Sequence, residues 1–337
     1  CLHFCGHFFL IKKFKPGCIT TIKPPLRRTL VLIQCASAKC CPKMNFSFSI
    51  SSLFLKEKMK RFAVKHFLLF ILVAISLPGF TQTAGKVLEQ RTVKSSILSR
   101  NIRYTVYLPP DYDHSDRSYP VVYLLHGYTD DNTGWLQFGE INRYADKAIA
   151  EGTIPPMIIV MPNGDSSWYI NSYDGKENYE DFFIKEFMPV IEKTYRIKAE
   201  KKYRGIAGLS MGGYGTLIYS MKYPDLFAAA APMSAAVWDD EQISTMQPDW
   251  WDGALGQLYG RGLTGKNRLN KAWYDNSILK IVDTKSADDL KKVRYWIDCG
   301  DDDFLTEGNC LLHIALTAKQ VPHQFRVRDG EHNWTYW

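Results

Sequence analysis

Cysteine is scarce over most of this 337-residue chain. Six of the eight cysteines precede residue 42, and only Cys299 and Cys310 follow. Residues 83–337 contain no C-x-x-C pair and no H-E-x-x-H sequence, so the usual patterns of a zinc site are absent there. We therefore expect no metal ion and no other cofactor. An exported protein could oxidise the two remaining cysteines to a disulfide, but we expect two isolated thiols, one at a strand end and one on a helix.

Acidic residues are nearly missing from the first 82 positions, which contain 13 Lys and Arg but only Glu57 as an acid. Subtracting these from the chain totals of 42 basic and 35 acidic residues leaves 29 and 34 for residues 83–337, a net charge of −5. The overall charge of +7 therefore comes from the N-terminal part. A mildly acidic body gives no electrostatic reason to expect nucleic acid or an anionic membrane as a partner.

The hydrophobic segment Phe67–Leu77 is too short to cross a bilayer, which takes about 20 apolar residues. It follows a basic stretch at 59–65 and precedes a Pro-Gly break with small residues at 78–82, which is the pattern of an export signal. We expect residues 59–82 to be a signal peptide that is removed, and residues 1–58 to be an upstream segment foreign to the native protein. An uncleaved signal anchor is the alternative. The predicted location of the remainder is periplasmic or extracellular, without stable insertion in a membrane.

The 255 residues from 83 onward predict one large α/β domain. Two β-rich runs at 91–98 and 102–108 predict an antiparallel entry hairpin. After them, apolar runs typical of buried strands alternate with helical patterns, which indicates a mostly parallel sheet with helices on both faces. We expect strands at 120–125, 157–161, 204–207, 227–232, 293–299 and 323–328, and helices at 141–150, 178–195, 211–222 and 307–319. Ligands bind such sheets at the carboxyl ends of the strands.

Residues 237–290 interrupt this alternation and are rich in tryptophan and tyrosine. We expect this stretch to be a cap inserted over the active site. The candidates for stacking on a substrate, in the cap and elsewhere, are Trp135, Trp168, Trp238 and Trp273. The alternative is that these side chains pack the protein interior, as buried tryptophans usually do.

The sequence Gly208-Leu209-Ser210-Met211-Gly212 has the form G-x-S-x-G and stands between a predicted strand and a predicted helix. In that position the glycines allow a tight turn that raises the serine hydroxyl above the end of the sheet. The following helix offers unpaired N–H groups to a developing oxyanion. We therefore predict Ser210 as a nucleophile. A glycine-rich turn with a serine cap on the helix is the alternative.

A serine nucleophile needs a base, and the base needs a carboxylate that orients it. For a serine on such a strand, turn and helix, the partners follow in the order acid, then histidine. Three consecutive aspartates, 301–303, follow a predicted strand, and any one of them could be the acid. His332 follows the last predicted strand and is the candidate base. His313, in mid-helix, and His323, at the opposite end of the sheet, are not expected to take part. Nor do we expect a metal at 301–303, because three neighbours on one turn cannot all face one ion.

His126 and Gly127 end a central strand, where the chain turns so that the backbone N–H of Tyr128 can point at a substrate oxygen. Together with the N–H of Met211 it would form an oxyanion hole, whose donors are each worth about 10²–10³ in rate. A plain turn at the end of a strand is the alternative.

Five segments taken together resemble the esterase-D-like family of α/β-hydrolases. They are His126-Gly127-Tyr128, Met161-Pro162-Asn163-Gly164, Gly208-Leu209-Ser210-Met211-Gly212-Gly213, Cys299-Gly300-Asp301-Asp302-Asp303-Phe304-Leu305 and Gly330-Glu331-His332-Asn333-Trp334. The resemblance covers residues from about 91 to the C-terminus and implies the α/β-hydrolase fold with a catalytic triad of Ser210, Asp303 and His332. In this family the acid is the aspartate before Phe-Leu, which selects Asp303, and the oxyanion donors fall on Tyr128 and Met211.

Members of the family continue past the histidine into a final helix, so we expect that a C-terminal helix is missing from this sequence. The family includes feruloyl and acetyl esterases, short-chain carboxylesterases, S-formylglutathione hydrolases and mycolyltransferases. The sequence therefore predicts an exported serine esterase that forms an acyl-enzyme. Its expected substrates are small-molecule or polysaccharide-linked esters, preferably acylated carbohydrates or aromatic acyl esters. The alternatives are an acyltransferase to a sugar or alcohol, a thioesterase similar to S-formylglutathione hydrolase, and a non-catalytic binding module.

Overall fold

A computed structural model describes residues 57–65 and 84–337 of the chain. The chain divides into two units between Pro78 and Gly79, and the two described parts belong to different units. Residues 57–65 form a helix. Most of the expected upstream segment (1–58) and of the expected signal peptide (59–82) lies outside the described residues. Among the described helices, none has both the length and the hydropathy that crossing a bilayer requires.

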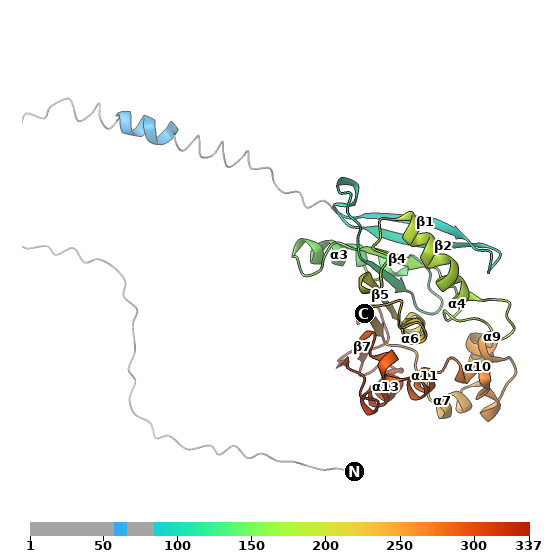
Figure 1. Cartoon of the computed structure of the whole chain (residues 1–337). Coiled ribbons are helices and arrows are strands. Elements are labelled where there is room, and N and C mark those ends of the chain that lie inside the picture. Colours follow the sequence, from blue (N-terminus) through green and yellow to red (C-terminus); the bar gives the residue numbers. More distant parts are fainter. Residues whose placement is uncertain (1–56, 66–83) are drawn as a thin grey trace, which may run out of the picture. The chain divides into compact units, whose positions relative to one another are not determined.

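A β-sheet forms the centre of the domain (Figure 1). It has eight strands in the order β1-β2-β4-β3-β5-β6-β7-β8. β2 is antiparallel to both of its neighbours, and the pairs from β4 to β8 are all parallel. The mostly parallel sheet that the sequence predicts is thus confirmed. The strands are β1 (Lys86–Lys94), β2 (Asn101–Leu108), β3 (Val121–Leu125), β4 (Ile158–Pro162), β5 (Arg204–Leu209), β6 (Ala229–Met233), β7 (Arg294–Gly300) and β8 (His323–Arg328).

The entry hairpin exists, but the expected first strand at 91–98 is placed too late. The observed β1 ends at Lys94, and residues 95–100 form a bent connection instead. The cause is a tertiary contact: the carboxylate of Glu186 accepts hydrogen bonds from the Ser95 hydroxyl at 2.6 Å and from the Ser96 amide at 3.1 Å. These bonds hold the backbone of the turn away from the β ladder, which the local pattern of apolar residues could not indicate.

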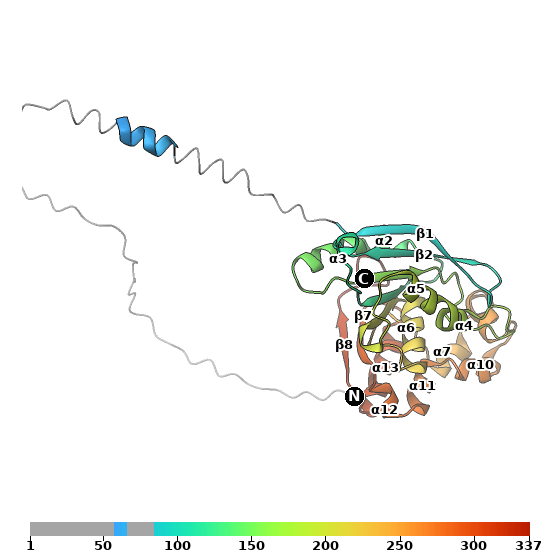
Figure 2. The ribbon, with the colours of Figure 1, turned by 45° about the horizontal axis from the view of Figure 1, so that its top comes forward.

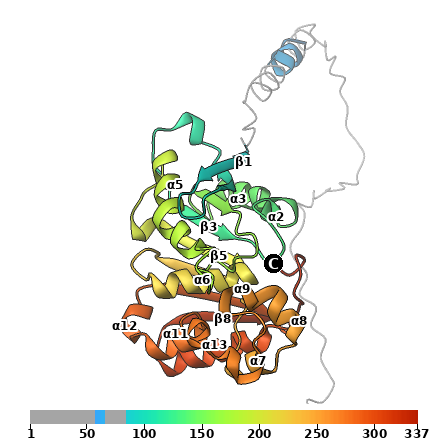
Figure 3. The same cartoon turned by 90° about the vertical axis from the view of Figure 1, so that its right-hand side faces the viewer.

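Helices cover both faces of the sheet (Figure 3). On one face, α2 (Gly134–Gln137) and α3 (Ile141–Ala150) pack over a small apolar cluster that includes Leu124 and Ile159. On the other face lies the main core, to which the long helix α6 (Met211–Lys222) contributes. α13 (Thr306–Ala318) packs on β7 beside it.

The amphipathic pattern at 178–195 folds as the successive helical segments α4 (Tyr179–Phe182), η2 (Phe183–Phe187) and α5 (Met188–Thr194), of which η2 is a π turn. The aromatic residues that define the pattern, among them Phe183 and Phe187, are fully buried against the main core.

Residues 237–290 fold into short helices inserted between β6 and β7 (orange in Figure 2). Arg268 holds this insertion together, because its buried guanidinium donates to the backbone carbonyls of Leu263, Ile243 and Met246 and lies 4.8 Å from the ring of Trp251. The segments are α7 (Asp240–Thr245), α8 (Pro248–Trp250), η4 (Trp251–Leu255), α9 (Gly256–Tyr259), η5 (Gly265–Arg268), α10 (Lys271–Tyr274), α11 (Ile278–Thr284) and α12 (Ala287–Leu290). Cys299 and Cys310 are both free thiols.

Candidate active site

Ser210 stands on a sharp turn between β5 and α6, with backbone angles φ 55° and ψ −116°. For a residue other than glycine this is a strained conformation, of the kind found where a side chain must be presented for function. The two flanking glycines make the turn possible. A Cβ on Gly208 would lie 2.6 Å from the carbonyl of Gly212, and a Cβ on Gly212 would lie 2.4 Å from the carbonyl oxygen of Leu125. Helix, turn and strand therefore approach each other more closely than any side chain would permit.

We expect Gly212→Ala to lower the free energy of unfolding by about 2–3 kcal/mol, because the added methyl group meets backbone that cannot move aside. The matched control is Gly253→Ala, since a Cβ there would have no atom within 4 Å. That control should leave stability unchanged or raise it by up to about 1 kcal/mol. Urea denaturation followed by circular dichroism measures both variants. Equal stabilities for the two would contradict the steric argument.

The side chains of Ser210, Asp303 and His332 meet at the carboxyl ends of three parallel strands. His332 Nε2 lies 2.9 Å from Ser210 Oγ, and His332 Nδ1 lies 2.8 Å from Asp303 Oδ2. Ser210 follows β5, Asp303 lies between β7 and α13, and His332 follows β8. Residues up to 122 positions apart in sequence thus form one continuous line of hydrogen bonds.

The carboxyl group of Asp303 is completely buried. Burial by itself opposes ionisation, but hydrogen bonds from His332, Ser234 and the Leu305 amide outweigh it and hold the pKa of Asp303 below its usual value. An ionised carboxylate accepts the proton on Nδ1 of His332, which leaves the lone pair of Nε2 facing the Ser210 hydroxyl. In this arrangement the imidazole is oriented to take a proton from the serine.

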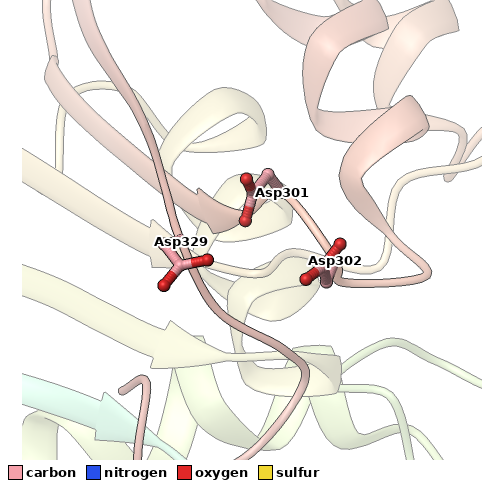
Figure 4. A group of neighbouring side chains, drawn as sticks. All are labelled: Asp301, Asp302 and Asp329. Atoms are coloured by element: carbon pink, nitrogen blue, oxygen red, sulfur yellow. The ribbon is translucent and has the colours of Figure 1, made fainter.

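The two neighbouring aspartates serve a different cluster. Asp301 and Asp302 face Asp329, and one carboxylate oxygen from each lies within 4.8 Å of the others (Figure 4). All three are exposed, and Asp301 also accepts a hydrogen bond from the Gly330 amide at 3.0 Å. The third member, Asp329, lies outside the 301–303 segment and comes from the loop after β8. An exposed acidic cluster alone does not indicate a metal site.

Two amide N–H groups beside Ser210 have no acceptor within residues 84–337. That of Met211 begins α6 and has no partner within the helix, and that of Tyr128 lies in the turn after β3. The turn is close to the serine, because a Cβ on Gly127 would lie 3.7 Å from the Cβ of Ser210. Both donors predicted for an oxyanion hole are therefore unpaired and border the site.

A cavity of about 460 Å³ opens at Ser210. Its lining contains many aromatic side chains and no lysine or arginine. The lining residues are Gly127, Tyr128, Thr129, Asp130, Phe138, Trp168, Leu209, Ser210, Ala236, Trp238, Trp250, Phe304, Leu305, His332, Trp334 and Trp337.

Two of the four predicted stacking tryptophans line this cavity, and two do not. Trp168 and Trp238 face one another there, with ring centroids 5.4 Å apart. Trp135 is buried beneath the site and donates to the Leu125 carbonyl at 3.0 Å. Trp273 is buried in the insertion and donates to Asp240 at 3.0 Å. Both indole N–H groups are satisfied inside the protein, so Trp135 and Trp273 are packing residues. For Trp135 and Trp273 the alternative that the sequence analysis left open, packing in the protein interior, therefore applies.

Five aromatic lining residues are absent from the predicted set: Phe138, Trp250, Phe304, Trp334 and Trp337. A signal for three of them was present, because Phe304 directly follows Asp303 while Trp334 and Trp337 follow His332 within five positions. Side chains adjacent to a catalytic loop residue are forced near the site.

His313 and His323 lie outside the site, as expected. They contact each other, with His313 Nδ1 and His323 Nε2 2.7 Å apart.

The chain is similar to known esterases in both sequence and fold. Esterase Rv1288 of Mycobacterium tuberculosis is 39% identical over 256 residues, which are 71% of this chain and 54% of that protein. The chain therefore spans about half the length of this curated relative. A solved ferulic acid esterase shares 36% identity and a TM-score of 0.64, over 76% of this chain and 94% of its own. A solved S-formylglutathione hydrolase (FrmB) from Staphylococcus aureus shares 27% identity and a TM-score of 0.61, over 75% of this chain and 94% of its own.

The α/β-hydrolase fold implied by the resemblance is confirmed by these structures and by the strand order. A family model described as "Putative esterase" matches residues 95–337, which include every element from β2 to β8 and all residues of the cavity. The chain belongs to this esterase family of α/β-hydrolases.

Proposed function

We propose that this protein is a serine ester hydrolase that acts through an acyl-enzyme, with esters of aromatic acids as its preferred substrates. The observation that carries the proposal is the line of hydrogen bonds from Asp303 through His332 to Ser210, which ends in an aromatic cavity. A buried carboxylate, an oriented imidazole and a strained serine beside two unpaired amides are the components of acyl transfer.

In the proposed mechanism each step depends on a particular group. Ser210 Oγ attacks the ester carbonyl carbon while its proton passes to Nε2 of His332, and the N–H groups of Tyr128 and Met211 stabilise the tetrahedral oxyanion. The carbon–oxygen bond to the alcohol then breaks, and the alcohol takes the proton from Nε2. Water repeats the sequence on the acyl-enzyme and releases the acid and free serine. Asp303 keeps the Nδ1 proton in place throughout.

The aromatic residues that line the cavity differ in whether their rings contact His332. The departing alcohol must lie beside Nε2, which donates its proton, so the side chains next to His332 flank the alcohol. These are Phe304 and Trp337, whose ring centroids lie 4.5 and 4.7 Å from that of His332. A second wall, formed by Trp168, Trp238 and Trp250, whose rings contact one another, is left for the acyl group. Three indole rings in mutual contact favour a flat aromatic acid over a short aliphatic one.

The similarity to a ferulic acid esterase supports the same substrate class. The similarity to an S-formylglutathione hydrolase favours a thioester substrate instead. Against the thioester, the lining of the cavity offers no lysine or arginine to pair with the carboxylates of glutathione. Purified enzyme should therefore hydrolyse methyl ferulate and p-nitrophenyl esters with a higher kcat/KM than S-formylglutathione. A preference for S-formylglutathione would overturn the substrate assignment and leave the acyl-enzyme mechanism standing.

An acyltransferase would use the same triad with a sugar or alcohol in place of water. Product analysis of methyl ferulate turnover, with and without added xylose or methanol as acceptor, separates the two reactions. We expect free ferulate as the main product in both cases. A transferred ester as the main product would assign the protein as a transferase.

We expect Trp238→Ala to lower kcat/KM for methyl ferulate about 10- to 100-fold while p-nitrophenyl acetate hydrolysis changes little, because the truncation removes stacking surface from the acyl wall. The matched control is Phe304→Ala on the alcohol side. The rate of deacylation distinguishes the two walls. The alcohol has already left the feruloyl-enzyme, so this rate depends on the residues around the acyl group. It should fall in Trp238→Ala and stay unchanged in Phe304→Ala, and the reverse result would exchange the two subsites.

We also propose export, which rests on the sequence pattern at 59–82. Expression from Met59 in a Gram-negative host, with cell fractionation and N-terminal sequencing, tests it. Periplasmic protein that begins near residue 83 supports export, and full-length protein in the cytosol contradicts it.

A further inference from the structure

His126 is a buried histidine at the end of β3 to which the mechanism above gives no role. Its side chain has almost no exposed surface, and both ring nitrogens have hydrogen-bond partners. Nδ1 lies 2.8 Å from the carbonyl oxygen of Gly127, and Nε2 accepts a hydrogen bond from the Gly164 amide at 2.8 Å.

These two contacts define the protonation state of the ring. The Gly164 amide can only donate, so Nε2 must carry a lone pair. The carbonyl of Gly127 can only accept, so Nδ1 must carry the proton. The imidazole is therefore neutral, with its hydrogen on Nδ1. Burial agrees, because it lowers the pKa of His126, although the Gly127 carbonyl and the carboxylates of Asp130, Asp131 and Asp165 act in the opposite direction.

The bond to Gly127 also fixes the orientation of a peptide group. The carbonyl of Gly127 and the N–H of Tyr128 belong to the same planar trans peptide, so they point in opposite directions. His126 and the Asp130 amide (3.3 Å) hold the carbonyl on one side. The N–H of Tyr128 must therefore point to the other side, and this turn borders the cavity where it passes Ser210.

A second loop holds His126 itself. Besides the Gly164 amide, the hydroxyl of Tyr169 donates to the carbonyl of His126 at 3.0 Å. Trp168 and Tyr169 in this loop have positive φ angles of 54° and 60°, which are strained for residues with side chains. The loop at 163–169 thus reaches the turn after β3 by two hydrogen bonds.

We propose that His126 is a positioning residue for the oxyanion hole, which holds the Gly127–Tyr128 peptide so that its N–H faces the reacting carbonyl. The proposal rests on the proposed ester hydrolase function. It assigns His126 an effect on the transition state through Tyr128, without contact between the imidazole and the substrate.

Two amide variants separate this role from a general structural one. In His126→Asn the side-chain NH₂ stands near the position of Nδ1 and can still donate to Gly127. In His126→Gln the amide reaches the position of Nε2 and can bond Gly164, but Gly127 loses its donor. We expect His126→Gln to lower kcat about 10²–10³-fold with little change in KM, and His126→Asn to retain kcat within about tenfold of the wild type.

Affinity for a trifluoromethyl ketone, which mimics the oxyanion, should fall in parallel with kcat, while affinity for the product acid stays unchanged. Equal losses in both variants, or wild-type kcat in His126→Gln, would overturn the proposal. Long-range ¹H–¹⁵N NMR of the wild-type protein gives a test that does not depend on the folding of a variant. We expect the neutral Nδ1–H tautomer for His126, and an Nε2–H tautomer or an imidazolium would refute the proposed role.

The outcome also separates the two proposals. A wild-type protein that neither hydrolyses esters nor reacts with a fluorophosphonate overturns the proposed function and this role with it. An active wild type with an unaffected His126→Gln variant overturns the role of His126 alone.

Discussion

Replacing Ser210 by alanine is expected to lower kcat for p-nitrophenyl acetate by about 10⁵–10⁶ and to abolish labelling by a fluorophosphonate. The variant loses the nucleophile that His332 contacts, while the oxyanion donors and the cavity remain. Some rate above the uncatalysed reaction should persist, since those groups still bind and polarise the ester. Active-site titration of the wild type with p-nitrophenyl acetate should show a burst of one equivalent if acylation is faster than deacylation.

The matched control for this variant is Ser220→Ala in the same helix. Ser220 is buried, and its hydroxyl donates to the Thr216 carbonyl at 2.7 Å, two helical turns or more from the site. We expect its kcat to equal that of the wild type. Turnover of Ser210→Ala near the wild-type rate would refute the nucleophile, and loss of activity in Ser220→Ala would show that the comparison reports on folding.

Asp303→Asn is expected to lower kcat by about 10⁴ without preventing folding. The side-chain amide nearly matches the carboxylate in shape, but its NH₂ group can turn toward Nδ1 and stabilise the wrong tautomer of His332. The hydrogen on Nε2 would then face Ser210, and no base would remain for the serine proton. Steady-state kinetics with p-nitrophenyl acetate measures the loss, and thermal unfolding verifies the fold.

Asp302→Asn provides the control, because it makes the same chemical change one residue away on an exposed side chain that faces Asp301 and Asp329. Its kcat should stay within about twofold of the wild type. A larger loss in Asp302→Asn than in Asp303→Asn would move the catalytic acid to the neighbouring position.

The low pKa of Asp303 also predicts a pH dependence. A carboxyl group whose pKa is depressed by folding stabilises the native state above its unfolded pKa of about 3.9. That stabilisation is lost as the pH falls through the folded-state pKa. Asp303→Asn should therefore unfold with a weaker dependence on pH in the acid range than the wild type.

Much of the fold followed from local patterns. The predicted bounds of α3, α6 and β8 agree with the structure, because periodicity, buried runs and turn residues act over a few neighbouring positions. The G-x-S-x-G sequence likewise indicated a turn with a raised serine, since the steric need for Gly208 and Gly212 is a property of that turn. The order of Ser210, the aspartates and His332 along the chain was enough to indicate the chemistry.

Other features depend on which distant segments come together, and the three-dimensional arrangement was needed to see them. The local sequence treats Asp301, Asp302 and Asp303 alike, and the family resemblance selected the last. The structure shows why they differ: one carboxyl group turns inward to His332 while two face Asp329. The four candidate tryptophans differ in position for the same reason. Trp168 and Trp238 line the cavity, while Trp135 and Trp273 donate hydrogen bonds to acceptors in the interior. Short-range sterics shape each segment, but the direction in which a side chain points depends on partners that the folded chain brings from far along the sequence.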